Sequence, residues 1–134
     1  MLLTIFQFFH KMETKPNLLK RTFDDVYGSG LNPKVYNGTK YTATLVPSGN
    51  INVYIHDCVF SYCSSTSSGG ALSCSSGIYK LLVDQTTVIS CRTTGQLGGG
   101  IYFYSSSYGQ CVLSRICGFN CSSTYSGISW GQFA

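Results

Sequence analysis

From residue 35 onward, apolar and polar side chains alternate in short runs, a pattern typical of β-strands. One run covers residues 40–46 and the next covers residues 51–60, and the Pro-Ser-Gly-Asn sequence between them is a clear turn signal. After residue 60, each short apolar run ends in a turn rich in serine, threonine or glycine. Since no segment beyond residue 40 has the 3.6-residue period of an amphipathic helix, we expect this part of the chain to be all-β.

One passage occurs nearly three times in this region. Two of its positions recur, a cysteine near its start (Cys63, Cys91 and Cys121) and a large apolar residue near its end (Leu72, Tyr102 and Trp130). The cysteines are 28 and 30 residues apart, and the large residues are 30 and 28 apart. Repeats of this length are typical of stacked units, each of which covers the apolar face of its neighbour.

Each repeat holds about three short strands joined by turns, which fits one coil of a three-sided β-solenoid at roughly 3.3 Å per strand residue. Equivalent residues of stacked coils lie about 4.8 Å apart, so the cysteines form one column at a corner and the large apolar residues form a second, inward column. The glycine pairs Gly69–Gly70 and Gly99–Gly100 allow a tight corner where a Cβ atom would clash. The sequence thus predicts about three coils over residues 41–134.

Residues 1–40 differ from the repeats and are predicted to form a helix and an irregular lead-in. On a helix, the apolar residues of 1–12 share one face, which fits a cap over the open end of the β-coils. The same segment is compatible with a degenerate signal peptide that lacks a basic n-region and an A-x-A-like cleavage site, with a disordered tail or with a membrane-surface helix. Residues 13–34 contain two prolines and two glycines and indicate a linker.

The net charge of +4 arises mostly from this N-terminal region, which holds six of the nine Lys and Arg residues. The remaining 94 residues carry only five charged side chains, Asp57, Lys80, Asp84, Arg92 and Arg115. Nucleic-acid binding needs basic residues gathered on a folded face. Because the basic residues here are scattered through the least regular part of the chain, we do not expect nucleic acid as a partner.

Seven cysteines cannot all pair within one chain. Three alternatives stay open, namely buried structural thiols, some disulfides, or a metal site. Cys58-x4-Cys63 and Cys117-x3-Cys121 resemble loose ligand pairs, but no histidine completes a zinc pattern with them, so no metal or cofactor is expected. In-register stacking makes the Cβ vectors parallel, which gives poor disulfide geometry, and mostly free thiols are expected.

The segment Phe60-Ser61-Tyr62-Cys63, followed by Gly69-Gly70-Ala71-Leu72, resembles the paired FxxN and GGA[ILV] repeats of polymorphic outer-membrane proteins. It is equally similar to cysteine-containing β-helix surface proteins of some parasitic protists. The resemblance covers about residues 51–134 and departs from the bacterial motif in having Cys63 where that motif has asparagine. It implies a right-handed parallel β-helix of the pectin-lyase-like type, displayed at a cell surface for adhesion.

A β-helix can also carry polysaccharide lyases and hydrolases, so an enzyme is the main alternative. Acid-pair glycoside hydrolysis needs two carboxylates about 5 to 9.5 Å apart. After residue 40 only Asp57 and Asp84 are available, at near-equivalent repeat positions, and we favour strand ends or solvent-facing turns for both. Since neither Arg92 nor Arg115 is arranged with them by any motif, no catalytic residue is assigned.

Three further features have a structural interpretation beside a functional one. His56 and Cys58 are two residues apart on a predicted strand, so both would project to the same face, as a nucleophile pair requires. The segment 95–100 lacks the Lys-Ser/Thr of a phosphate loop and is interpreted as a repeat corner with an insertion. A sugar-stacking strip is the alternative to a stacked core for four tyrosines, Tyr102, Tyr104, Tyr108 and Tyr125.

The sequence therefore predicts a non-enzymatic, surface-type β-helix module for binding or display, located at a cell surface or outside the cell. The alternatives are a fragment of a carbohydrate-active enzyme without its catalytic coils, and a structural spacer or truncated gene product. A glycan or a host or cell-surface protein is the expected kind of partner. Two N-glycosylation sequons, at Asn37 and Asn120, matter only if the chain is secreted.

The last residues add an expectation about self-association. The sequence stops at Ala134, after Trp130 and Phe133, without a polar capping element. Open strand edges beside apolar side chains are templates for further strand pairing, so end-to-end association is expected.

Overall fold

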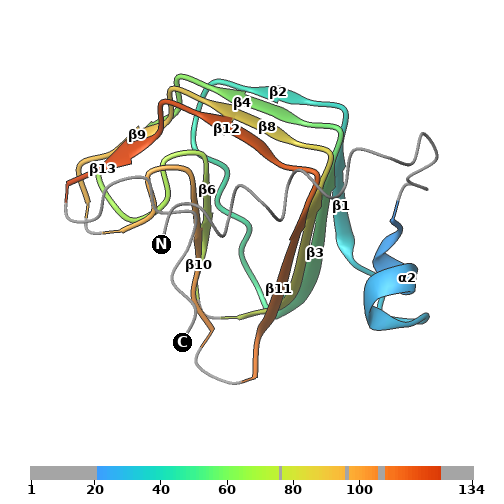
Figure 1. Cartoon of the computed structure of the whole chain (residues 1–134). Coiled ribbons are helices and arrows are strands. Elements are labelled where there is room, and N and C mark those ends of the chain that lie inside the picture. The colour runs from blue at the N-terminus through green and yellow to red at the C-terminus, as the bar shows by residue number, and fades with distance from the viewer. Residues whose placement is uncertain (1–20, 76, 96, 106–107, 125–134) are drawn as a thin grey trace, which may run out of the picture.

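The computed structural model describes residues 21–75, 77–95, 97–105 and 108–124. Strands dominate this part of the chain, which confirms the all-β prediction (Figure 1). The predicted helix at 1–12 and Trp130 of the apolar column lie outside the described residues. The strands are β1 (Lys34–Asn37), β2 (Lys40–Tyr41), β3 (Ile51–His56), β4 (Val59–Ser61), β5 (Ser64–Ser65), β6 (Leu72–Cys74), β7 (Ile78–Asp84), β8 (Thr87–Ile89), β9 (Arg92–Thr93), β10 (Ile101–Phe103), β11 (Gln110–Ser114), β12 (Cys117–Phe119) and β13 (Ser122–Ser123).

The strands pair into four sheets, and every pairing between named strands is parallel. Their orders are β1-β3-β7-β11, β2-β4-β8-β12, β5-β9-β13 and β6-β10. The chain passes through the sheets in the same sequence each time and then returns to the first sheet, one strand further along (Figure 1). Each such pass is called a repeat below.

A full repeat holds four short strands rather than the three predicted, because residues in the left-handed conformation divide the apolar runs. In the predicted run 51–60, Asp57 has a φ of 54° and separates β3 from β4. Gln85 and Arg115 take the same conformation at equivalent positions, with φ of 45° and 51°, and Gly38 does so in the first repeat with φ of 61°. A single left-handed residue bends the chain sharply, so the corner needs no loop.

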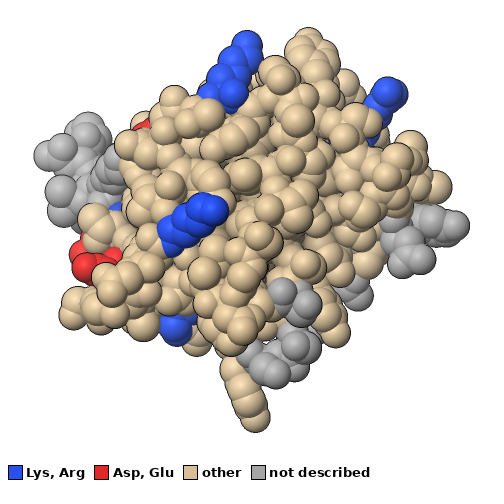
Figure 2. All heavy atoms as spheres, turned by 180° about the vertical axis from the view of Figure 1, so that it is seen from behind, with Lys and Arg blue, Asp and Glu red and all other residues tan. Residues whose placement is uncertain are grey.

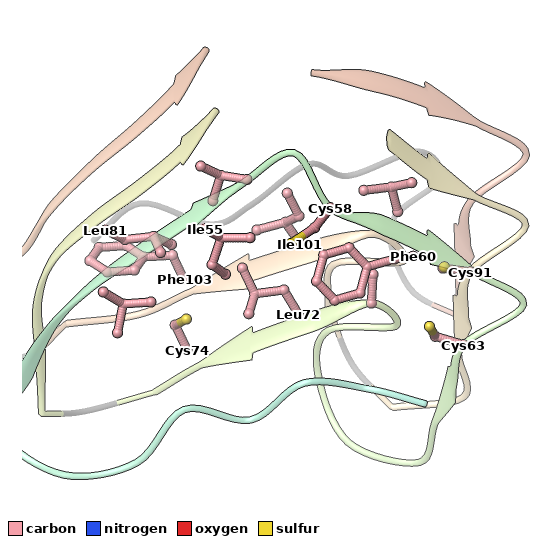
Figure 3. Close-up of a cluster of buried hydrophobic side chains, with 14 of the residues drawn as sticks. Ile55, Cys58, Phe60, Cys63, Leu72, Cys74, Leu81, Cys91, Ile101 and Phe103 are labelled. Carbon is pink, nitrogen blue, oxygen red and sulfur yellow. The ribbon is translucent and has the colours of Figure 1, made fainter. Parts of the chain in front are cut away.

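The cysteine column predicted from the repeats is confirmed. Parallel pairing of β5, β9 and β13 sets the residues that precede these strands at one position of successive repeats, namely Cys63, Cys91 and Cys121. All three side chains are buried. The two sulfur atoms labelled at this corner in Figure 3 lie one above the other.

The predicted apolar column is wrong by one residue. Leu72 pairs with Ile101, and Tyr102 pairs instead with Ser73. Leu72 and Ile101 are fully buried, whereas Tyr102 is only half-buried. The connection before β10 is one residue longer than the connection before β6, so counting back from the cysteines puts the wrong residue inside. Leu45 continues the true inner column into the first repeat through a parallel bridge to Leu72.

Replacing Leu72 with alanine is expected to lower the free energy of unfolding by about 2 to 5 kcal/mol, because this side chain is fully buried between neighbouring repeats. Tyr102→Ala is the matched control and should cost clearly less, since Tyr102 lies on the other face of its strand. Urea unfolding followed by circular dichroism measures both. Equal losses would contradict the corrected register.

The interior is filled by one cluster of apolar and cysteine side chains from all four sheets (Figure 3). Ile55, Phe60, Leu81 and Ile101 are among its fully buried members. In the first repeat Tyr41 occupies the position of Phe60, and the two rings stack with centroids 4.8 Å apart and planes 13° apart. The inner side chains therefore form columns that run from one repeat to the next.

A short helix, α2 (Phe23–Tyr27), interrupts the lead-in that the sequence predicts to be irregular. Its start is set by a capping box, in which the Thr22 hydroxyl accepts from the Asp25 amide and the Asp25 carboxylate accepts from the Thr22 amide. A capping box satisfies two backbone donors that the first turn of a helix otherwise leaves free. The spacing of Thr22 and Asp25 was the available sequence signal for this helix.

The α2 helix packs on the outer face of the β1-β3-β7-β11 sheet (Figure 1). Phe23 is buried, with its ring centroid 6.1 Å from that of Tyr54 on β3. The Tyr27 hydroxyl donates to the Leu81 carbonyl of β7 at 2.7 Å and to the Gln110 carbonyl of β11 at 3.3 Å. The helix therefore bridges three strands that belong to three successive repeats.

Paired strands begin at Lys34, earlier than the predicted start of the repeats at residue 41. The first repeat is short, because β1 pairs with β3 in the register Lys34 to Val53, a step of 19 residues. Within the part of the chain that the structure describes, no helix has the length and apolarity needed to cross a membrane.

Candidate functional site

The cysteine column has a hydrogen-bonding role at the corner. Each of its cysteines follows a residue in the left-handed conformation, Tyr62, Ser90 or Asn120. Each thiol then lies within donating distance of the carbonyl two residues before it, at 3.9 Å for Cys63, 3.3 Å for Cys91 and 3.5 Å for Cys121. A buried carbonyl needs a partner, and a thiol is a small donor that fits a packed corner.

The neighbouring corner uses a hydroxyl in the same way. Cys58 donates to the His56 carbonyl at 3.3 Å, and Thr86, at the equivalent position of the next repeat, donates to the Asp84 carbonyl at 3.0 Å. Because threonine replaces cysteine there, the corner requires a small donor rather than a thiolate. All seven cysteines are free thiols, and the described residues contain no cluster of three or more His, Cys, Asp or Glu side chains that could hold a metal ion.

The seven thiols are expected to differ sharply in reactivity toward a disulfide reagent at pH 8. Cys117 is exposed, whereas burial raises the pKa of Cys74 and of Cys111 to about 12, which leaves almost no thiolate at that pH. Cys117 should react first, and Cys74 and Cys111 only after unfolding in guanidinium. Mass spectrometry of quenched time points identifies the labelled residue. Rapid labelling of Cys74 in the native protein would contradict the buried position.

Ionisable side chains gather at one place outside the core, where β3 and β7 end. We call this group the outer polar cluster, and its members are Tyr54, His56, Asp57, Asp84 and Arg115. His56 and Asp84 are register partners on β3 and β7. Asp57 and Arg115 occupy left-handed corners beside them. The parallel register therefore brings together residues that are up to 61 positions apart in the sequence.

Asp84 and Arg115 form the central ion pair of the outer polar cluster. Arg115 Nε donates to Asp84 Oδ1 at 2.9 Å, and an Arg115 terminal nitrogen donates to Asp84 Oδ2. The Asp84 side chain is fully buried, and the Arg115 side chain is 23 % exposed. The hydrogen bond to Asp84 raises the pKa of Arg115 above its usual value. Both carboxylate oxygens of Asp84 thus face the guanidinium in a two-pronged pair.

The rest of the outer polar cluster is also engaged internally. His56 Nδ1 lies 2.8 Å from Asp57 Oδ2, and the His56 ring packs on Tyr54 with centroids 4.4 Å apart. The Tyr54 hydroxyl donates to the Arg21 carbonyl at 2.9 Å. Burial raises the pKa of Tyr54, and the negative charges of Asp84 and Asp57 add to this shift. The arrangement fastens the end of the sheet to the segment that precedes α2.

The structure places the two predicted aspartates side by side, since the Asp57 amide donates to the Asp84 carbonyl at 3.3 Å. Asp84, however, is neither at the surface nor without a partner, as a strand-end or solvent-facing role would require. Sequence reasoning missed Arg115 as its partner. Arg115 lies 31 residues after Asp84, one residue beyond the step between β7 and β11. That offset was a signal that pointed to neighbouring corners.

The predicted common face of His56 and Cys58 is wrong. Cys58 belongs to the inner core, whereas His56 packs on Tyr54 of the outer face. Asp57 between them is left-handed, so the strand alternation that puts every second residue on one face does not continue through it. A nucleophile pair of His56 and Cys58 therefore has no geometric basis.

Tyrosines are exposed at the corner between the β6-β10 sheet and the first sheet. We call Tyr79, Tyr104 and Tyr108 the tyrosine edge, and their exposed fractions are 46 %, 38 % and 102 %. Tyr79 is the extra residue of a β-bulge, because Ile51 pairs with Ile78 and the next residue pairs with Lys80. A bulge re-aims a side chain out of the regular alternation. The stacked-core interpretation is thus wrong for Tyr104 and Tyr108, and Tyr125 lies outside the described residues.

The remaining polar features lie apart from these groups. Asn37 and Asn120 of the two sequons are both exposed, and Asn120 Nδ2 donates to Ser90 Oγ at 3.2 Å. The segment 95–100 forms a corner, where the register sets Gly99 beside Gly70, as interpreted from the sequence. On the face seen in Figure 2, lysine and arginine side chains stand singly and do not gather into a basic patch.

Comparison with known proteins adds no relative to this picture. No protein-family model matches the chain, and neither the curated proteins nor the solved structures contain a match.

Proposed function

We propose that the four parallel sheets form a right-handed parallel β-helix of pectin-lyase-like type, and that the chain acts as a non-enzymatic surface module for binding or display. The proposal rests on the repeated parallel register, on the short FxxN-like and GGA-like motifs and on the tyrosine edge. Display at a cell surface or outside the cell, with a glycan or a cell-surface protein as partner, belongs to the same proposal.

The observation that carries a binding role is the tyrosine edge. Folding buries large apolar side chains wherever it can, yet Tyr79, Tyr104 and Tyr108 lie on one corner with much of their rings in water. Aromatic rings with a polar hydroxyl suit stacking on sugars and packing against proteins. Exposed tyrosine on a rigid frame loses little conformational freedom when a ligand binds.

The enzyme alternative has weaker support from the same residues. Hydrolysis by an acid pair needs two carboxylates that reach the substrate. Asp84 is fully buried and held by Arg115, so it cannot approach a sugar without breaking its ion pair. The outer polar cluster is therefore better explained as an internal fastening than as a catalytic centre.

A glycan array probed with the purified chain tests the proposal. Tyr79→Ser combined with Tyr108→Ser should abolish binding of any ligand found, because both exposed rings of the edge are removed. Tyr62→Ser is the matched control, since Tyr62 is 76 % exposed at a different corner. Binding that survives the double substitution would contradict the assigned edge. Release of reducing ends from acidic polysaccharides would instead support an enzyme, and absence of any ligand would favour a spacer.

A further inference from the structure

The stack of repeats has two free strand edges with different identities. At one end lie β1 and β2, which pair only with β3 and β4, and at the other lie β11 and β12, which pair only with β7 and β8. Strand residues of the middle repeats are mostly buried, whereas those of β1 and β12 are mostly exposed. Free strand edges offer unpaired backbone donors and acceptors to another chain.

Because all pairings are parallel, each repeat is related to the next by a simple step along the stack. The free edge of β11 therefore presents the groups that β7 presents to β11, and the free edge of β1 presents the groups with which β11 meets β7. The two ends are complementary rather than identical. A partner that fits one end must resemble the other end of the same molecule.

The corners of the end repeats match in position and conformation. Gly38 of the first repeat and Arg115 of the last repeat are equivalent residues, with φ of 61° and 51°. The strands before the corner, β1 and β11, have four and five residues, and those after it, β2 and β12, have two and three. A second copy could thus continue both sheets through the corner without a change of path.

The inner columns also continue across such a junction. One column runs from Tyr41 through Phe60 and Val88 to Gly118, so a large ring stands at its first position and a glycine at its last. A copy stacked beyond β12 would set its Tyr41 over Gly118, where no side chain occupies the column. A second column places Tyr36 of the added copy over Leu113. Large against small is the packing that stacked layers need.

We propose that a second copy of this chain docks head to tail, with its β1 and β2 paired in parallel on β11 and β12 of the first. The contact is heterologous, so a docked copy leaves one free end of each kind and the assembly can grow. The docking uses two of the four sheets, since the first repeat has no strand in the β5-β9-β13 sheet.

Disulfide trapping tests this register. Lys40, Val59, Thr87 and Cys117 form one outward column, so the docked copy would place its Lys40 beside Cys117 at about 4.8 Å, a distance that a disulfide can span. Within one chain the two residues are three steps apart, about 14 Å, and cannot be linked. Mild oxidation of Lys40→Cys with diamide should therefore convert monomer into a ladder of dimers, trimers and larger species on non-reducing gels.

Controls separate docking from random collision. Tyr62→Cys also adds an exposed thiol, but away from both free edges, and should give only trace dimer. Tryptic mapping of the ladder should find the 40–117 link. Sedimentation velocity of the wild-type chain should show an average mass that rises with concentration.

Several results would overturn the proposal. A concentration-independent monomer with no excess linkage in Lys40→Cys would mean that the edges are not docking surfaces. Wild-type protein that links through Cys117 and stops at dimer would indicate face-to-face pairing of identical ends. Neither result bears on the tyrosine edge, so the proposed binding function is tested separately.

Discussion

Replacing Gly70 with alanine is expected to prevent stable folding, with a loss of at least about 4 kcal/mol in the free energy of unfolding. A Cβ atom at Gly70 would lie 2.0 Å from the Gly99 carbonyl oxygen and 2.8 Å from the Arg92 amide nitrogen. Both are backbone atoms of the next repeat, so no side-chain rotation relieves the overlap. The repeats would have to separate at this corner. Far-ultraviolet circular dichroism and urea unfolding measure the effect.

Gly38→Ala is the matched control for this loss. Gly38 also lies at a corner and has a φ of 61°, but an added Cβ would meet no heavy atom within 4 Å. Only the left-handed conformation opposes the substitution, at about 1 to 2 kcal/mol. If both variants lost the same stability, glycine would be required for its backbone freedom alone, and the close approach of repeats at Gly70 would not be the cause.

Replacing Arg115 with alanine is expected to cost about 3 to 5 kcal/mol, because it leaves the fully buried carboxylate of Asp84 without its partner. The double variant Asp84→Leu/Arg115→Met should recover most of this loss. A buried ion pair contributes little net stability over apolar residues of similar size, but a single buried charge is costly. Chemical denaturation of the wild type and the three variants gives the coupling energy.

Arg92→Ala serves as the control for the loss of an arginine. Arg92 lies exposed on β9 and is outside the outer polar cluster, so its removal should change the free energy of unfolding by less than about 0.5 kcal/mol. A loss at Arg92 equal to that at Arg115 would show that general charge, not the Asp84 pair, controls stability. An additive double variant would show that Asp84 and Arg115 do not interact.

The all-β class and the cysteine column could be predicted from the sequence because their signals are local. Short alternating runs with Ser, Thr and Gly turns exclude long helices, and a small donor recurs wherever a corner carbonyl needs a partner. Cys63, Cys91 and Cys121 are close enough in sequence to their corners that insertions elsewhere do not disturb the alignment. The handedness and the surface role stay proposals based on resemblance.

The inner apolar column could not be aligned from the sequence, because one inserted residue between β9 and β10 changes which neighbour points inward. Cysteine spacing predicted Tyr102 inside, and pairing put Ile101 there. The same limit applies at His56 and Cys58, where one left-handed residue reverses the expected face. Side-chain direction depends on every backbone angle before it, so a single local change alters the result.

By itself the sequence determined the repeating β-architecture and the corner cysteines, since both follow from residue type and spacing within a few positions. Only the tertiary structure decided the Asp84–Arg115 ion pair, the packing of α2 across three strands and the exposure of the tyrosine edge. These features join residues of different repeats, and such contacts depend on the register with which one repeat stacks on the next. That register is a property of the whole packed stack, which no single segment encodes.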